Sequence, residues 1–114
     1  MDKKDILKAA GLDYDGALAR FMGNEGLLTR FLNKFLSDPN FLNLQSAIDQ
    51  GDTETAFRAA HTLKGVAGNL SLTELYDKAM KISEVLRGGD LEQAKALMPE
   101  VQAAYEKITN ALKD

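Results

Sequence analysis

The sequence predicts an all-α domain, an antiparallel up-down four-helix bundle with short N-terminal helices covering one end. Apolar residues recur at helical spacing along most of the chain, and the alternating β-branched runs typical of strands are missing. The 114 residues suit one compact domain, which we expect to span residues 1–114. Very short polar or glycine-containing segments separate the long helical patterns, and such connections favour antiparallel neighbours.

The first part of the chain predicts two short helices and one long one. Residues 2–9 and 14–21 have the pattern of short helices that cover one end of the core. Asn24 can cap a following helix. Apolar spacing then runs through residues 24–50, interrupted only at Pro39. We therefore expect one long helix that is kinked or briefly broken near Pro39.

Two more helices follow, over residues 52–69 and 71–87. Asp52 is placed to cap the first of them. In the segment "SLTE", Ser71 and Glu74 have the spacing of a capping box at the start of the second helix. Two consecutive glycines after Arg87 provide its stop signal.

The last predicted helix covers residues 90–113 and opens at Asp90 in "DLEQ". Its distal half carries a stripe of apolar residues at helical spacing. Pro99 lies inside it, where a proline removes one backbone hydrogen bond and clashes with the preceding turn. We expect a kink or a break near Met98.

Composition excludes several classes of function. Lys plus Arg is 14 and Asp plus Glu is 17, a net charge of −3, so nucleic acid and anionic membranes are poor partners. With no cysteine, disulfides and thiolate metal sites are excluded. The opening "MDKKDILKAAG" has no apolar signal-peptide core, and no apolar run approaches the ~20 residues that a membrane span needs. We expect a cytoplasmic protein, and a monomer.

The helix over residues 52–69 carries the only histidine, in "AHTLKGVAG". On a wheel with Ala56 at the centre of the core stripe, His61 falls at about 140°, on the outer face. Gly65 and Gly68 fall near 180° and 120°, on the same side as the imidazole. Lys64, three residues after the histidine, is its immediate neighbour. The imidazole should therefore stand on a bare, exposed surface that another protein can approach closely.

A lone surface histidine is usually just a solvated side chain, and a glycine near a helix end is often a cap. That explanation suits Gly68 but hardly suits Gly65, which costs about 1 kcal/mol relative to alanine in a helix interior. The conjunction of His61, Lys64 and two glycines on one face favours a function. Glu54, Arg58 and Asn69 are further candidates for contacts at the rim of this face.

The chemistry open to this histidine is narrow. One histidine without cysteine does not make a zinc site, and no phosphate-binding glycine-rich motif is present. Near neutral pH an exposed imidazole is largely uncharged and has a free lone pair that can attack phosphorus. Lys64 can offer a cation to the phosphoryl oxygens. A partner protein would have to bring any metal ion and the acidic residues that hold it.

The segment "AAHTLKGVAGNL", residues 59–70, resembles the signature of the histidine-containing phosphotransfer (HPt) domain family. The pattern is a histidine followed by leucine, lysine and glycine at +2, +3 and +4 and a small residue at +7. Similarity extends over residues 10–112, including "LLTRFLNKFL" and "AIDQGDTETAFRAAH". One departure is Ser71, where many members have glycine.

The resemblance implies a phosphorelay intermediate. His61 would accept a phosphoryl group from the aspartate of a response-regulator receiver domain, or donate one to it, and Lys64 would assist at that group. Gly65 and Gly68 would clear room for the receiver. Hybrid sensor histidine kinases are the expected upstream partners, and Mg²⁺ is expected on the receiver, with no cofactor on this chain. Some members carry a polar residue about 22 positions downstream that bonds the imidazole, a position held here by Ser83 and followed by Glu84.

Two other functional hypotheses remain. The same bare face could dock a receiver or another partner without any transfer of phosphate, as a pure interaction module. An enzyme with His61 as general base is less favoured, because the sequence offers neither a pocket nor a second titratable partner at readable spacing. We expect a phosphocarrier that has no kinase activity and no nucleotide-binding site of its own.

Overall fold

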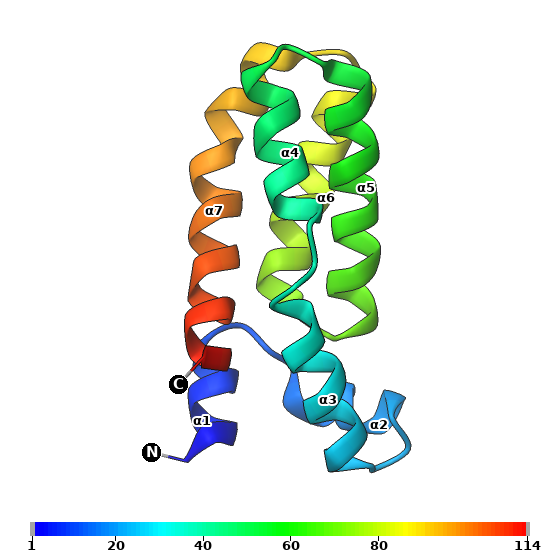
Figure 1. The fold of residues 1–114 in the computed structure, drawn as a ribbon, viewed down its shortest axis with the longest axis vertical. Coiled ribbons are helices and arrows are strands. Elements are labelled where there is room, and N and C mark those ends of the chain that lie inside the picture. Colours follow the sequence, from blue (N-terminus) through cyan, green and yellow to red (C-terminus); the bar gives the residue numbers. More distant parts are fainter. Residues whose placement is uncertain (1, 114) are drawn as a thin grey trace.

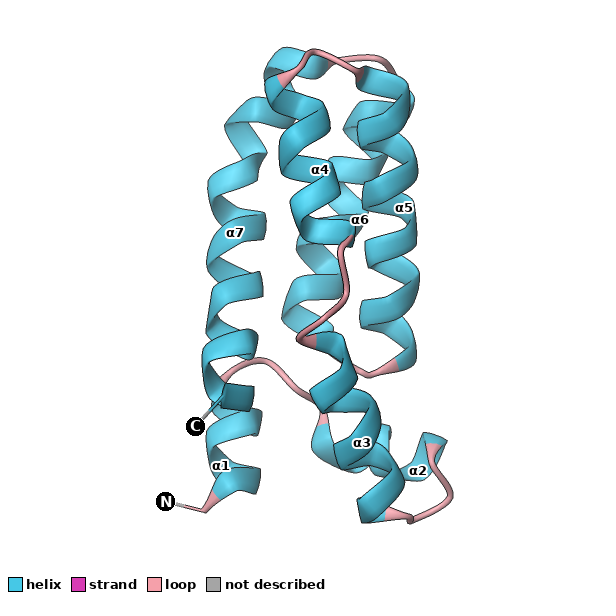
Figure 2. Ribbon diagram, in the orientation of Figure 1, coloured by secondary structure: helices cyan, strands magenta, loops and turns pink. Residues whose placement is uncertain are grey.

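A computed structural model describes residues 2–113, and every regular element in that range is a helix (Figures 1 and 2). A single isolated β-bridge within that range joins Leu12 to Leu72. The helices, in chain order, are α1 (Lys3–Ala9), α2 (Tyr14–Arg20), α3 (Glu25–Phe35), α4 (Asn40–Asp49), α5 (Thr53–Asn69), α6 (Thr73–Arg87) and α7 (Leu91–Lys113).

Side-chain caps begin most of these helices. Asn24 accepts a hydrogen bond from the backbone N–H of Leu27 at the start of α3. Asp52 does the same for α5, and Asp90 for α7. Each cap satisfies one of the backbone donors that the first turn of a helix leaves without a partner. Asn24, Asp52 and Asp90, three of the capping residues expected from the sequence, therefore act as caps.

The helical pattern over residues 24–50 is broken next to Pro39, which confirms the second of the two expected alternatives. α3 ends at Phe35 and α4 begins at Asn40, and residues 36–39 lie outside both helices. Pro39 has no backbone N–H and disfavours helical geometry in the residue before it. The Asp38 carboxylate instead accepts the backbone N–H of Asn40, at 2.9 Å, which starts the new helix.

The capping box expected at the start of α6 is wrong. Ser71 adopts a left-handed backbone with φ of 57°, and α6 begins without a side-chain cap after Leu72. The carbonyl of Ser71 accepts the N–H of Asp13, at 2.9 Å. The Glu74 carboxylate lies against the Lys107 ammonium, with both oxygens at 3.0 Å. These tertiary contacts outweigh the local capping preference.

The break allowed for near Met98 does not occur, because α7 runs from Leu91 to Lys113 as one helix with Pro99 inside it. The missing proline N–H would have bonded to the carbonyl of Lys95, four residues earlier. Pro99 and Lys95 are both exposed, so that carbonyl can take its hydrogen bond from water.

The four C-terminal helices, α4 to α7, surround the main core. α5 packs against α4 and α6, and α7 packs against α6 and α4. Figure 1 shows these helices joined by short turns at alternate ends, with α1, α2 and α3 gathered at the lower end. The ring of Tyr105 on α7 stacks on Phe41 of α4, with centroids 4.2 Å apart and planes 10° apart. None of the described helices is long and apolar enough to cross a membrane.

Candidate functional site

His61 lies in the middle of α5, with its side chain exposed. The residues on either side of it in the core stripe, Ala60 and Leu63, are completely buried. The helix thus has one face fixed in the core, and this anchors the backbone under the histidine. The imidazole leans against the ring of Phe57, one turn earlier, with centroids 5.9 Å apart and planes inclined by 27°.

The two glycines beside the histidine have different surroundings. A Cβ at Gly65 would meet no atom within 4 Å, so the surface one turn after His61 is open. A Cβ at Gly68 would lie 3.3 Å from two carbons of the Tyr76 ring on α6. Gly65 therefore leaves space above the helix, whereas Gly68 allows an aromatic ring of the next helix to approach the α5 backbone.

Two cationic side chains flank His61, three residues before and three residues after it. Arg58 is exposed, and its guanidinium donates to Glu54 at 3.1 Å and to the Thr55 hydroxyl at 3.4 Å. Lys64 is half-buried, and its ammonium makes no ion pair with any residue in the range 2–113. Lys64 is therefore available to an anion at the histidine, while Arg58 is engaged with Glu54.

Contacts between α5 and α6 fix which residues face each other. Gly68 lies against Tyr76, and Phe57 lies under the guanidinium of Arg87, 5.7 Å from the ring centroid. Moving seven residues back from Gly68 reaches His61, and moving seven forward from Tyr76 reaches Ser83. In this antiparallel register Ser83 lies level with His61.

Ser83 and Glu84 nevertheless differ in what they can offer. The Ser83 hydroxyl is fully buried and has no hydrogen-bond partner among the described residues, so it does not bond the imidazole. Glu84 is exposed and pairs with Arg87 at 3.4 Å. Sequence reasoning missed Phe57, which lies against the imidazole, and Arg87, which lies over Phe57. The i−4 spacing of Phe57 from the histidine was the only available signal.

The remaining candidates lie further along α5. Glu54 is in its first turn and Asn69 is its last residue, so they are about 10 and 12 Å from His61 along the axis. Asn69 borders an apolar pocket of ≈ 440 Å³ between α5 and α3, whose floor includes Phe31, Phe35 and Val66. The sequence-predicted site residues thus form a row along α5, with Arg58, His61, Lys64 and Gly65 at its centre.

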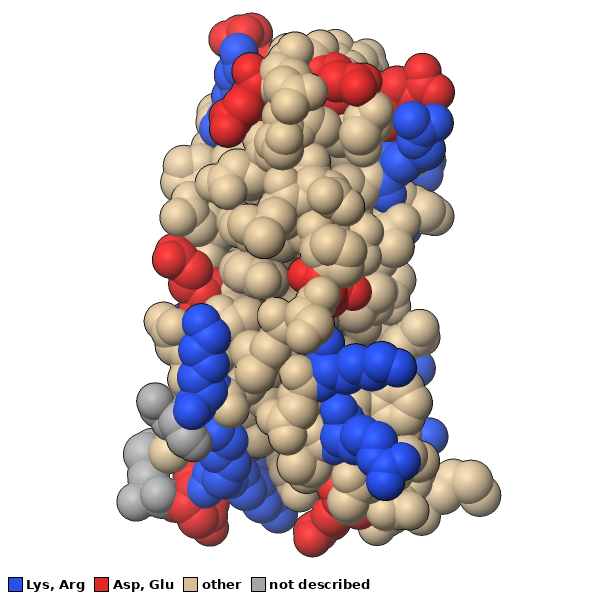
Figure 3. Space-filling model, in the orientation of Figure 1, with Lys and Arg blue, Asp and Glu red and all other residues tan. Residues whose placement is uncertain are grey.

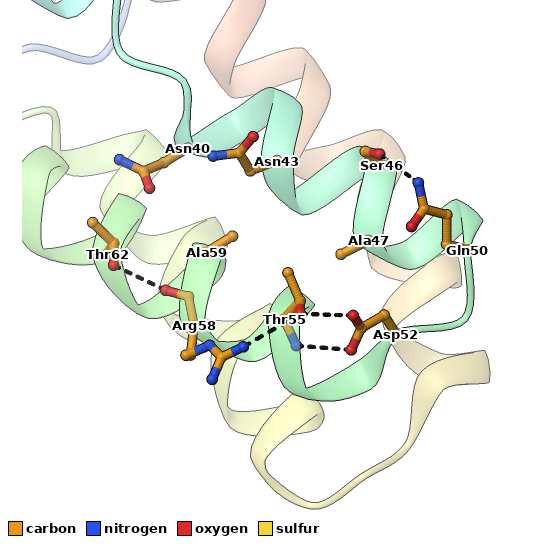
Figure 4. A pocket seen from close by; sticks show the side chains of 10 residues that line it. All are labelled: Asn40, Asn43, Ser46, Ala47, Gln50, Asp52, Thr55, Arg58, Ala59 and Thr62. Carbon is orange, nitrogen blue, oxygen red and sulfur yellow. Dashed lines mark hydrogen bonds between the residues drawn. The ribbon is translucent and has the colours of Figure 1, made fainter.

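A polar groove of ≈ 330 Å³ runs between α4 and α5 on one side of this row. Arg58, Thr55 and Asp52 line it from α5, and Figure 4 shows Arg58 pointing back toward Thr55. In Figure 3 the middle of the face over α4 is largely free of charged side chains, and charges gather toward the two ends. No group of His, Cys, Asp and Glu within residues 2–113 is arranged to hold a metal ion.

Comparison with protein families gives a match to the Hpt domain, the histidine-containing phosphotransfer family, over residues 28–111. The chain belongs to the Hpt domain family. The match spans α4, α5 and α6 completely, including His61, and leaves α1 and α2 outside it. Comparisons with curated proteins and with solved structures give no match.

Hpt domains are phosphocarrier modules of two-component phosphorelays, not kinases, and they interact with response-regulator receiver domains. The only histidine of this Hpt domain is His61. Three features of this chain suit such an exchange: the exposure of His61, the open surface at Gly65, and a Lys64 ammonium with no ion-pair partner within residues 2–113.

Proposed function

We propose that this Hpt domain is a cytoplasmic phosphorelay intermediate that carries a phosphoryl group on His61. The observation that carries the proposal is the exposed imidazole of His61 beside the open surface at Gly65. A receiver's aspartyl phosphate can approach this surface without meeting a side chain at position 65. We further infer that α4 to α7 act as an antiparallel up-down four-helix bundle that holds this face rigid.

In the forward step, a ring nitrogen of His61 attacks the phosphorus of the receiver's aspartyl phosphate. The N–P bond forms as the bond between phosphorus and the carboxylate oxygen breaks, and the aspartate leaves as a carboxylate. The proton on the other ring nitrogen stays on the imidazolium or passes to water. The reverse step returns the phosphoryl group to an aspartate, so direction depends on the partners' relative free energies.

The residues around His61 have distinct proposed tasks. The Lys64 ammonium, unpaired in the described structure, would neutralise charge on the transferring group. Gly65 supplies clearance. Gly68 contributes indirectly, because it lets the ring of Tyr76 on α6 lie close to the α5 backbone. Asn69 and the apolar pocket that it borders offer the receiver a surface to bury, and Glu54 lies at the opposite rim.

The receiver, rather than this chain, would bring Mg²⁺ and the acidic residues that bind it. A hybrid sensor histidine kinase, whose own receiver is phosphorylated first, is the proposed source of the phosphoryl group. We expect the Hpt domain to act as a monomer, since the His61 face is the surface reserved for the receiver.

The alternative is an interaction module that docks a receiver without transfer. Two measurements on wild type and His61→Gln separate these functions: transfer of label from a phosphorylated receiver with Mg²⁺, and receiver affinity. The phosphocarrier predicts acid-labile label on the wild type, none on the variant, and similar affinities. Binding by both proteins without label on either would establish the interaction module instead.

A further inference from the structure

Arg58 is held beside His61 by contacts that are easily exchanged. Its guanidinium donates to the Glu54 carboxylate at 3.1 Å and to the Thr55 hydroxyl at 3.4 Å (Figure 4 shows the latter). The side chains of Arg58 and Glu54 are 66% and 81% exposed. Ion pairs this exposed are weak, so a stronger anion nearby can displace Glu54.

Helix geometry places Arg58 within reach of a group on His61. Residues three apart on a helix are surface neighbours, with Cβ atoms about 5–6 Å apart. Arg58 and Lys64 lie about 60° to either side of His61 around the helix axis, one turn before it and one turn after it. Lys64 provides a point charge, whereas a guanidinium provides a planar fork that matches two phosphoryl oxygens.

Phosphorylation would change the balance between the two anions. Glu54 offers one negative charge, about 10 Å from His61 along the helix axis. A phosphoryl group carries close to two negative charges and three acceptor oxygens near neutral pH. Arg58 lies between Glu54 and His61 along the helix, and its guanidinium can bond to only one of the two anions well.

We propose that Arg58 leaves Glu54 when His61 is phosphorylated and binds the phosphoryl group, so that Glu54 competes against the phosphorylated state. This inference rests on the proposed function, and it changes the role of Arg58 from a rim contact to a phosphoryl ligand. Arg58 and Lys64 together then hold the phosphoryl group from opposite sides. Glu54 tunes how readily the group moves on to a receiver.

The first test places a phosphoryl group on His61 without a receiver. Phosphoramidate can supply it: the imidazole forms the N–P bond, the donor's N–P bond breaks and ammonia leaves. The side-chain ¹⁵Nε resonance of Arg58 should shift in the phosphorylated protein, and that of Arg20 on α2 should not. An Arg58 resonance unchanged while His61 is phosphorylated overturns the inference.

The second test measures the equilibrium of phosphoryl exchange with a receiver. That equilibrium depends only on the free proteins in their two states, so a residue that merely contacts the receiver cannot change it. Arg58→Gln should shift it away from the Hpt domain by roughly three- to fivefold, and Glu54→Gln should shift it toward the Hpt domain by roughly twofold. The double variant should behave as Arg58→Gln alone.

Glu92→Gln is the matched control, because Glu92 is an equally exposed partner in a helical ion pair, with Lys95 at 3.5 Å. It should leave the equilibrium unchanged. An Arg58→Gln equilibrium equal to wild type overturns the inference. If phosphoramidate moves the Arg58 resonance but no receiver exchanges phosphate, the proposed function fails while the Arg58 contact stands.

Discussion

Gly68 of α5 lies directly against the ring of Tyr76 of α6, where a Cβ at position 68 would be 3.3 Å from both Cδ1 and Cε1. The missing side chain lets the ring of Tyr76 lie close to the α5 backbone, seven residues after the histidine. A Cβ at Gly65, one turn closer to His61, would have no atom within 4 Å. The two glycines of the motif therefore have different surroundings, one packed against an aromatic ring and one open.

Gly65→Ala should raise stability and lower activity together. Alanine is favoured over glycine in a helix interior, so the free energy of unfolding should rise by about 0.5–1 kcal/mol, measured by urea denaturation. The added methyl group stands where the receiver approaches, and we expect transfer to slow by roughly ten- to a hundredfold. A variant that is more stable and equally fast would contradict the clearance role.

Gly68→Ala is the matched comparison at the other glycine. Its methyl group must displace the Tyr76 ring, which is 38% exposed and can move outward. The gain in helix propensity should be offset by this displacement, leaving stability within about 0.5 kcal/mol of wild type. A stabilisation equal to that of Gly65→Ala would show that the ring contact is unimportant.

Ser83→Ala should stabilise the domain. The Ser83 hydroxyl is completely buried without a hydrogen-bond partner among the described residues, and such a group costs about 1–3 kcal/mol. Removing it should raise the midpoint of thermal unfolding. Because the hydroxyl does not bond His61, phosphotransfer should remain unchanged. A loss of transfer in a stable Ser83→Ala protein would show that the hydroxyl reaches the imidazole during the reaction.

Tyr105 should make the domain less stable in alkali. Burial, and to a smaller extent the charge of Asp38, raise the pKa of the Tyr105 phenol above its usual value of 10.0. As pH rises, the Tyr105 phenol therefore ionises in the unfolded chain before it ionises in the folded protein. The free energy of unfolding keeps its whole contribution from Tyr105 below pH 10 and falls as pH rises above 10. Tyr105→Phe keeps the stacking on Phe41 and should remove this part of the alkaline loss, measured as unfolding midpoints against pH.

Asp52 should contribute to the loss of stability at acid pH. Hydrogen bonds from the Thr55 hydroxyl and backbone N–H, with a smaller contribution from the charge of Arg58, lower the pKa of its carboxyl below 3.8. Stability from the charged cap is present above pH 3.8 and is lost as pH falls through the lower folded-state pKa. Asp52→Asn keeps a capping oxygen but does not titrate, so its stability should depend less on acid pH. Identical curves of unfolding free energy against acid pH for wild type and Asp52→Asn would contradict this.

The helical pattern, the caps and the histidine face could be predicted from the sequence because they depend on neighbours along one helix. Asn24, Asp52 and Asp90 bond to residues three positions away, and His61, Lys64 and Gly65 share a face through helix geometry alone.

The errors involve contacts between distant segments. The Ser71 capping box failed because the chain near Asp13 bonds the Ser71 carbonyl, while Lys107 of α7 takes the Glu74 carboxylate. The contact between the Tyr76 ring and Gly68 could not be predicted from the sequence either, because it depends on the register of α5 against α6. Local spacing carries no information on such pairings.

The most direct test of the account is an NMR measurement of the His61 imidazole. His61 is the only histidine, so the imidazole nitrogens of ¹⁵N-labelled protein can be assigned without ambiguity. After incubation with a phosphorylated receiver and Mg²⁺, one ring nitrogen should show a changed shift and coupling to ³¹P. Unchanged imidazole resonances, with the phosphoryl group still on the receiver or on another side chain, would contradict the account.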